Sequence, residues 1–171
     1  MRTTLSTKEN INIYNIYLYM FDFIGYYGPI ILFVINIFFI WKKAFYLNVY
    51  LIGFLVNVYL NKLLKVIFRE PRPEFSKPFT INDNFENEEK YGMPSGHAQT
   101  AFFSISYLYL CVRSPYLLGI TTFIGFITLY QRWKYNNHYI NQLIVGSLIG
   151  AGFALSLYYL TSVYLFKASM V

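Results

Sequence analysis

The chain has 171 residues, of which 56% are hydrophobic, 22% aromatic and 13% charged. Soluble domains carry about a quarter charged residues, so this composition and the recurring long apolar runs predict a single all-α membrane domain, residues 1–171, with a very apolar soluble bundle as the weak alternative. The net charge of +6 does not indicate nucleic-acid binding, because the aromatic residues lie in apolar runs and not beside a basic stripe. Cys111 is the only cysteine, which excludes an intrachain disulfide and a cysteine-based metal site.

About six transmembrane helices are predicted in chain order, in two groups (residues 10–68 and 97–166) separated by a polar loop at 69–96 that is expected to carry the active site. The first ten residues are polar and no small-residue cleavage site follows, so the first helix is expected to insert uncleaved, either across the membrane or in its interface. Pro29 is expected to begin the second helix, since proline is favoured in the first turn. The predicted helices are 11–26, 29–41, 45–68, 97–112, 116–130 and 138–166.

Six crossings would place both termini on one side of the membrane and three polar clusters together on the other. The clusters are 65–73, 95–97 and 132–138. The side away from the clusters would carry six basic residues and only one acid, Glu9, so the positive-inside rule makes that side cytosolic. The basic residues are Arg2, Lys8, Lys42, Lys43, Arg113 and Lys167. The clusters are therefore expected on the lumenal or exterior face.

Within the second cluster, Pro94, Ser95 and Gly96 predict a tight turn that leads into a helix beginning near His97. A helix start presents free backbone N–H groups and the positive end of the helix dipole, which suits an anion such as phosphate. His97 adds a side chain that can carry a proton near neutral pH. Taken alone, Ser-Gly before a helix is often just a cap. The interpretation as an anion site therefore depends on the other polar clusters that are predicted on the same face.

Three basic residues and both histidines of the chain converge on this face. Lys65 and Arg72 are six residues apart across a helix end, and Arg132 precedes His138 with five residues between them. Interfacial lysine and arginine usually extend to lipid headgroups, and a single interfacial histidine is usually just solvated. The placement of all five residues on one membrane face nevertheless indicates a functional site. The short loop before His138 carries three polar side chains, Lys134, Asn136 and Asn137. The sequence leaves open whether they contact a ligand or only solvent.

Such a site suits a phosphate. Arginine binds phosphate oxygens through two hydrogen bonds and lysine supplies a mobile charge, while the Ser95 hydroxyl and the amides of Gly96 and His97 would complete a cradle. One histidine can attack phosphorus to form a phosphohistidine while the other protonates the leaving oxygen. The cations supply the neutralisation that Mg²⁺ provides elsewhere, and no carboxylate–histidine arrangement suggests a metal site, so no metal or other cofactor is expected.

These spacings resemble the three signature motifs of the type 2 phosphatidic-acid phosphatase superfamily, metal-independent membrane lipid phosphatases with six helices. The motifs are Lys65 to Arg72-Pro73, then Pro94-Ser95-Gly96-His97, then Arg132 to His138, and the resemblance spans about 45–150. It implies that His138 is the nucleophile and His97 the general acid. It also implies the residues that hold the phosphate: Lys65, Arg72, Ser95, Gly96 and Arg132.

Two positions depart from the general pattern of the superfamily. Gln131 replaces a serine before the third-motif arginine, and Gln142 replaces an aspartate four residues after His138. Residues at i and i+4 face each other on a helix, so the Gln142 carbonyl can accept the Nδ1–H of His138 and fix its tautomer. A glutamine cannot stabilise an imidazolium as a carboxylate does, and the general pattern would thus predict a weak enzyme.

The flanking residues resemble the dolichyl-diphosphatase branch of the superfamily, which also has glutamine in place of the aspartate. They are Glu70-Pro71-Arg72-Pro73, Tyr91-Gly92-Met93-Pro94-Ser95, His97-Ala98-Gln99 and Gln142; Gly96 stands where that branch has a second serine. The branch implies hydrolysis of a polyprenyl diphosphate to the monophosphate on the lumenal face of the endoplasmic reticulum. The alternatives are a phosphatase for another lipid phosphate, such as phosphatidic acid or undecaprenyl diphosphate, or a non-catalytic lipid-binding scaffold.

The expected partners are the lipid substrate and membrane lipids, with no nucleic acid, and the oligomeric state stays open. Three glycines on the last helix, Gly146, Gly150 and Gly152, are expected to serve close helix packing and not chemistry.

Overall fold

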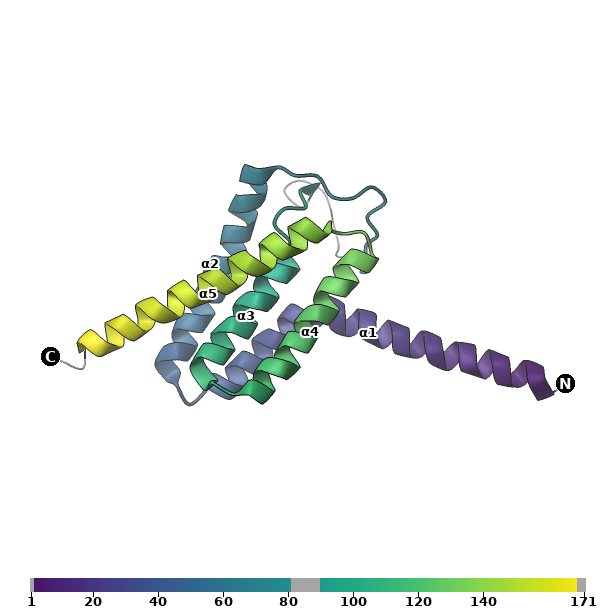
Figure 1. The fold of residues 1–171 in the computed structure, drawn as a ribbon, viewed down its shortest axis with the longest axis horizontal. Helices are drawn as coiled ribbons and strands as arrows, with labels where there is room; N and C mark the ends of the chain where they lie inside the picture. The colour runs from purple at the N-terminus through teal and green to yellow at the C-terminus, as the bar shows by residue number, and fades with distance from the viewer. Residues whose placement is uncertain (1, 81–89, 169–171) are drawn as a thin grey trace.

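The computed structural model describes residues 2–80 and 90–168, with side chains from 16 to 80 and from 90 to 167. Within these ranges the chain forms five α-helices and no β-strand (Figure 1). The helices are α1 (Arg2–Ile40), α2 (Ala44–Phe68), α3 (Gly96–Val112), α4 (Pro115–Lys134) and α5 (Ile140–Ala168). The prediction of an all-α fold is therefore confirmed for the part of the chain that is described.

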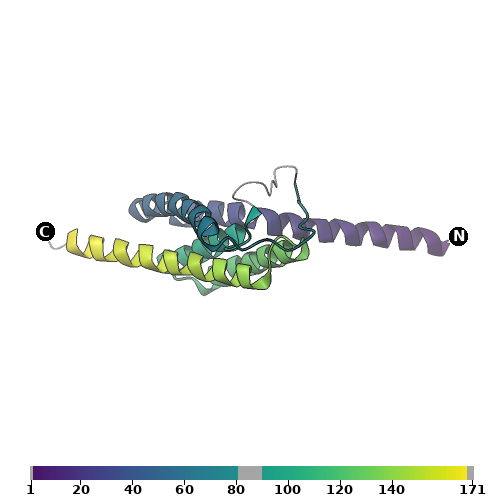
Figure 2. The ribbon, with the colours of Figure 1, turned by 90° about the horizontal axis from the view of Figure 1, so that it is seen from above.

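Helix α3 is the centre of the bundle. It packs against each of the other four helices, most extensively against α5, and α1 also packs along α4. Seen from above, the bundle is shallow, with α1 and α2 on one side and α4 and α5 on the other (Figure 2). The N-terminal part of α1 and the C-terminal part of α5 extend from it in opposite directions (Figure 1).

The predicted boundary between a first and a second helix is wrong. The residues on both sides of Pro29 form the single helix α1, with Pro29 in its interior. A proline removes one backbone hydrogen bond, but a break inside a lipid bilayer would expose further polar groups with no water to satisfy them. The helix also packs tightly on α4 at this level, because a β-carbon on Gly28 would collide with the Thr128 hydroxyl.

Three helical segments of the described chain are long and apolar enough to cross a membrane: Ile16–Ile40, Ala44–Phe68 and Ile140–Lys167. Large apolar side chains remain exposed along them, including Phe38 at 75% and Leu55 at 71%. A soluble monomer rarely exposes so much apolar surface, whereas lipid-facing helices require it. These findings support a membrane bundle, with five helices in the described residues in place of the predicted six.

The single helix α1 changes the expected topology. The loops after α1 and α3 lie at one end of the bundle, here called the far end, and the loops after α2 and α4 lie at the other, the site end (Figure 1). Helix α1 therefore begins beyond the site end, while α5 ends at the far end. The six crossings from which a shared side for both termini was predicted are not found in the described residues, and Arg2, Lys8 and Glu9 do not belong to the charge of the far end.

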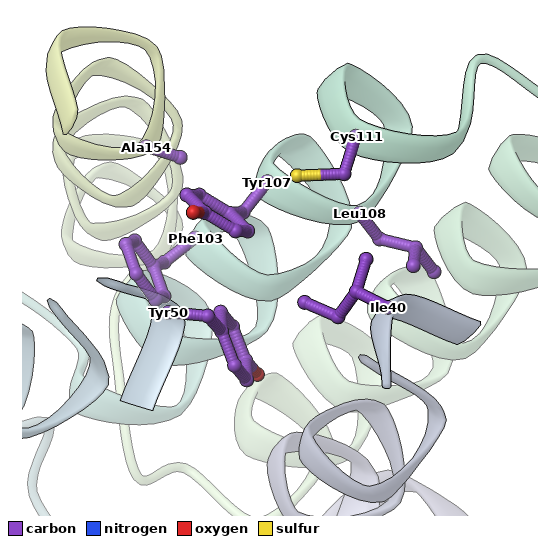
Figure 3. Close-up of a cluster of buried hydrophobic side chains, with 7 residues drawn as sticks. All are labelled: Ile40, Tyr50, Phe103, Tyr107, Leu108, Cys111 and Ala154. Carbon is purple, nitrogen blue, oxygen red and sulfur yellow. The ribbon is translucent and has the colours of Figure 1, made fainter. Parts of the chain in front are cut away.

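An aromatic core fills the far half of the bundle (Figure 3). Its buried members come from α1, α2, α3 and α5: Ile40, Tyr50, Phe103, Tyr107, Leu108, Cys111 and Ala154. The two buried tyrosine hydroxyls have partners, since Tyr50 shares a hydrogen bond of 2.9 Å with Ser104 Oγ and Tyr107 donates to the Tyr46 carbonyl at 2.9 Å. Apolar and aromatic side chains thus fill this half of the bundle, and the polar residues of the site gather in the other half.

Close contact between α5 and α3 brings the third motif to the second. A β-carbon on Gly146 would lie 2.6 Å from the Ser95 carbonyl oxygen, and one on Gly150 would collide with the Gln99 backbone. No atom lies within 4 Å of the same position at Gly152. The packing role is thus confirmed for the first two glycines and wrong for Gly152.

Candidate active site

The buried face of α2 supplies the first group of the site. Its buried positions recur every three or four residues and change from Tyr50 and Gly53 at the far end to Asn57, Asn61 and Lys65 at the site end. Lys65 is only 2% exposed. A long cationic side chain of this kind usually extends to water, so its position inside the bundle needs a nearby anion or strong polar partners.

The loop after α2 carries Arg72 to the start of α5. Its Nη1 donates to the Asn137 carbonyl at 2.8 Å and to His138 Nε2 at 3.1 Å. The loop is held in place by pairing with the segment before α3, because the Gly92 amide donates to the Glu70 carbonyl at 2.8 Å. The first and third motifs therefore meet directly at His138.

The second motif forms the predicted turn and helix start. Ser95 is fully buried and caps α3 by accepting a hydrogen bond from the Ala98 amide at 3.4 Å. Gly96 and His97 lie in the first turn, where backbone amides have no partner within the helix. The His97 ring lies 5.5 Å from the Tyr26 ring, centroid to centroid, and the Tyr26 backbone hydrogen-bonds it.

A buried amide network supports this turn from below. Asn61 Nδ2 donates to Gln99 Oε1 at 2.8 Å and to the Pro94 carbonyl at 3.2 Å, and Gln99 Nε2 donates to Asn57 Oδ1 at 3.0 Å. These partners were missed at the sequence level. The signal was the spacing of Asn57, Asn61 and Lys65, each four residues after the last, which places three polar groups on one face of an apolar helix.

Arg132 lies in the last turn of α4 and is 2% exposed, with its guanidinium carbon 5.6 Å from the centre of the Tyr26 ring. The adjacent Lys134 has a separate, structural role. Its Nζ binds both carboxylate oxygens of Asp22 on α1, at 2.8 and 2.7 Å, and Tyr135 donates to the same carboxylate at 3.0 Å. This pairing holds α4 against α1 at the level of the site.

Of the three loop residues whose role was open, only Asn136 lines the hollow beside His138. Lys134 is bound to Asp22, and Asn137 is fully buried. Asn137 Nδ2 donates to the Lys77 carbonyl at 2.8 Å and to Ser76 Oγ at 3.1 Å, so it fixes the loop after α2. The alternative that Asn137 contacts only solvent is therefore wrong, and Asn137 is a structural residue.

His138 lies two residues before α5, not at its first residue as predicted, and is 3% exposed. A guanidinium can only donate, so Nε2 accepts from Arg72 and the proton sits on Nδ1. Nδ1 donates to the Gly92 carbonyl at 2.9 Å and lies 3.3 Å from Gln142 Oε1. The predicted contact with Gln142 is present, but a backbone carbonyl that the sequence did not reveal is the nearer acceptor.

Burial and the surrounding positive charges both lower the pKa of the two histidines. Both lie outside the candidate spanning segments, and burial, the main cause, holds the pKa of each well below the usual 6.5. Neighbouring positive charges lower both values further; they are Lys65, Arg72 and Arg132. A site with this much positive charge, in which His138 Nε2 accepts a hydrogen bond from Arg72, is suited to an anion.

Among residues 2–80 and 90–168, no group of three histidine, cysteine or acidic side chains is arranged to hold a metal ion. Four acidic residues of the polar loop, for which the sequence predicts no role beyond solvation, lie outside the described residues: Asp83, Glu86, Glu88 and Glu89.

The fold and site define a helical membrane protein with a histidine pair among buried cations, and comparison with known proteins agrees with this class. The model of the PAP2 superfamily matches residues 45–164. The chain belongs to the PAP2 superfamily.

Two curated proteins are similar to this chain in sequence. The chain is 27% identical over 136 residues to the dolichyldiphosphatase of Saccharomyces cerevisiae, covering 63% of this chain and 53% of that protein. It is 32% identical over 119 residues to the palmitoyl-protein thioesterase-dolichyl pyrophosphate phosphatase fusion 1 of Schizosaccharomyces pombe, covering 63% of this chain and 18% of the fusion. The chain thus spans about half of the first relative and a smaller part of the second. No solved structure matches it.

Proposed function

We propose that the protein is a metal-independent phosphatase that hydrolyses a polyprenyl diphosphate, such as dolichyl diphosphate, to the monophosphate and inorganic phosphate. The observation that carries the proposal is the state of His138. Its Nδ1–H is tied to the Gly92 carbonyl, and its Nε2 lone pair is turned toward Arg72. This is the arrangement that a nucleophilic imidazole needs beside a bound phosphate.

In the proposed reaction, the Nε2 lone pair of His138 attacks the terminal phosphorus, and the bond from phosphorus to the bridging oxygen breaks. The electron pair of that bond stays on the bridging oxygen, which takes the proton of His97 as the lipid monophosphate leaves. Water then attacks the phosphohistidine and gives a proton to His97, and the nitrogen–phosphorus bond breaks to release inorganic phosphate. His138 returns to its neutral form with the proton still on Nδ1.

The proposed phosphate site is formed by Lys65, Arg72 and Arg132 together with the first turn of α3. The lowered pKa values of both histidines describe the site without an anion. A bound diphosphate would offset the three cations and raise both pKa values, so that His97 can hold the proton that it donates. Charge neutralisation by the protein itself is the reason for proposing a reaction that needs no metal.

A lipid substrate is supported by the surface beside His138. A hollow of about 510 Å³ is lined by His138 and Asn136 together with Trp133 and Ile140. Trp133 and Ile140 also line a second hollow of about 490 Å³, whose other lining residues lie on the apolar faces of α4 and α5. The two hollows therefore pass from polar to apolar, which fits a phosphate headgroup followed by a hydrocarbon tail. The names of the two relatives point to a dolichyl diphosphate.

We further propose that the site faces the lumen of the endoplasmic reticulum or an equivalent exterior space. The far end of the bundle carries a basic cluster in its short loops and at the end of α5: Lys42, Lys43, Arg113 and Lys167. No acidic residue lies in those loops. The site end carries more lysine and arginine, and we assign those residues to phosphate binding and to packing of the site; the basic loops that remain, at the far end, then favour a cytosolic far end.

Phosphate release from dolichyl diphosphate, measured with purified protein in detergent and EDTA, tests this function. We expect release by the wild type and none by His138→Ala. Equal, slow release by both would mean that the chain is a non-catalytic scaffold, and a requirement for Mg²⁺ would contradict the mechanism. Faster release from phosphatidic acid or undecaprenyl diphosphate would keep the reaction and change the substrate.

A further inference from the structure

A chain of hydrogen bonds joins the Glu70 carboxylate to His138 through the side chain of Gln142. Gln142 Nε2 donates to Glu70 Oε1 at 3.0 Å and to the Pro71 carbonyl at 2.9 Å. At its other end, Gln142 Oε1 lies 3.3 Å from His138 Nδ1. Gln142 is fully buried, so both ends of its amide bind protein groups.

The position of this amide depends on a glycine. A β-carbon on Gly92 would overlap the Gln142 side-chain amide. Gly92 also donates its N–H to the Glu70 carbonyl at 2.8 Å and accepts from His138 Nδ1 at 2.9 Å. The absence of a side chain at residue 92 thus allows three separate parts of the chain to meet: the loop after α2, the segment before α3 and the start of α5.

The carboxylate itself is also fixed. Asn141 Nδ2 donates to Glu70 Oε1 at 3.1 Å, so two consecutive side chains of α5, Asn141 and Gln142, bind the same oxygen. Glu70 is half-buried, and the contact with Asn141 lies at the surface of the protein. The carboxylate is therefore held in line with the amide that reaches the histidine.

We propose that Glu70 is a positioning residue that stabilises positive charge on His138 through the Gln142 amide. The proposal rests on the proposed function, because the ring becomes positively charged during the reaction when Nε2 binds phosphorus. The Nδ1–H proton then has to be shared with a strong acceptor, and an isolated amide is a weaker one than a carboxylate. Donation from Gln142 Nε2 to a carboxylate makes Oε1 a stronger acceptor, since linked hydrogen bonds polarise one another.

This arrangement gives a physical reason why a glutamine can replace a carboxylate beside the nucleophile. Three cations surround His138, and together they oppose the formation of a cationic ring. Glu70 places one negative charge at the other end of the amide, where it offsets part of that opposition. The charged or titratable groups that face the ring are Lys65 from α2, Arg72 from the loop, His97 from α3 and Arg132 from α4.

The first test compares Glu70→Gln with Glu74→Gln, which makes the same change at an exposed position four residues later in the loop. We expect Glu70→Gln to lower kcat for dolichyl diphosphate about tenfold, with little change in KM, as outer partners of catalytic groups typically do. It should also move the acidic limb of the kcat/KM profile to lower pH, because losing a negative neighbour lowers the pKa of His138. Glu74→Gln should behave as the wild type.

The second test asks whether a carboxylate placed directly beside the ring replaces the relayed one. Gln142→Asp in the Glu70→Gln background should restore activity above that of Glu70→Gln alone. The same substitution in the wild type should lower activity, because it brings two carboxylates together and removes the amide that Glu70 accepts from. A purely structural Glu70 would show no such reversal between the two backgrounds.

The third test needs no substrate. In a His97→Asn variant with a histidine-free tag, His138 is the only histidine left, so diethyl pyrocarbonate reports on it alone. At one neutral pH, Glu70→Gln should slow the modification several-fold and Glu74→Gln should not. An unchanged rate overturns the link, whatever happens to hydrolysis. A slowed rate in a protein that releases no phosphate would support the link and reject the proposed function.

Discussion

Lys62 and Lys65 are neighbours on α2 with opposite environments. Lys62 is exposed, whereas Lys65 is buried among the residues of the site. We interpret Lys65 as a ligand for phosphate, because it is buried and its charge, like those of Arg72 and Arg132, acts on both histidines of the site.

These two lysines give a matched pair of variants. Lys65→Ala should lower kcat/KM for the lipid diphosphate about 100-fold, as the loss of one preorganised donor to transition-state charge does in other enzymes. Lys62→Ala should leave it within about twofold, since exposed charges contribute little. Similar losses in the two variants would contradict a specific phosphate contact.

The pH dependence follows from the lowered pKa of His138. The ring must be neutral to attack, so kcat/KM should fall on the acidic side with a midpoint below 6.5. Removing a positive neighbour favours the charged ring and raises its pKa, so the midpoint should move to higher pH in Lys65→Ala. A profile measured with both proteins checks the sign, and a shift to lower pH would be inconsistent with the electrostatics described above.

At the level of residues, the sequence predicts the charged members of the site but not what orients them. Histidines and basic residues stand out in apolar surroundings, and their spacing places them at helix ends. The Gly92 carbonyl has no side-chain signature, and its contact with His138 arises only when the segment before α3 meets the start of α5. The contact between Glu70 and Gln142 depends on the same meeting of distant segments.

At the level of elements, polar residues that recur with the helix period are more informative than proline. The run of Asn57, Asn61 and Lys65 identifies the face of α2 that turns inward. Pro29 predicts a helix start, but α1 continues through it. A membrane penalises an interrupted helix more strongly than water does, so a rule derived from soluble proteins failed at this position.

Two glycines of α5 test the contact between α3 and α5. Gly150→Ala should lower the free energy of unfolding by about 1–3 kcal/mol, because its β-carbon would collide with the Gln99 backbone. Gly152→Ala has open space and should be neutral or slightly stabilising, since alanine favours helix. Thermal unfolding in detergent measures both variants. Equal unfolding midpoints would show that the close contact between α3 and α5 at Gly150 does not contribute to stability.

At the level of the whole molecule, the class and architecture were predicted, and the helix count and topology were not. Composition and apolar runs were enough to indicate a membrane bundle whose polar motifs meet at one end. Merging the first two helices moves the start of α1 to the site end and leaves the end of α5 at the far end. The orientation inferred from loop charge stays a prediction, because the single α1 moves Arg2, Lys8 and Glu9 to the site end and leaves only the far-end residues to support it.

The revised topology predicts different environments for tags at the two ends of this chain. In sealed microsomes, a tag before α1 should be protected from added protease and one after α5 should be digested. Detergent should expose both. Digestion of both tags without detergent would restore the six-helix topology, and the reverse pattern would invert the proposed orientation.

Phosphohistidine formation tests the central claim most directly. The protein would be mixed briefly with dolichyl diphosphate labelled in its terminal phosphate, quenched in alkali and examined for label that alkali retains and acid removes. We predict label on His138 in the wild type and none in His138→Ala. Label that persists in His138→Ala, or rapid hydrolysis by a wild type that never carries label, would contradict the mechanism.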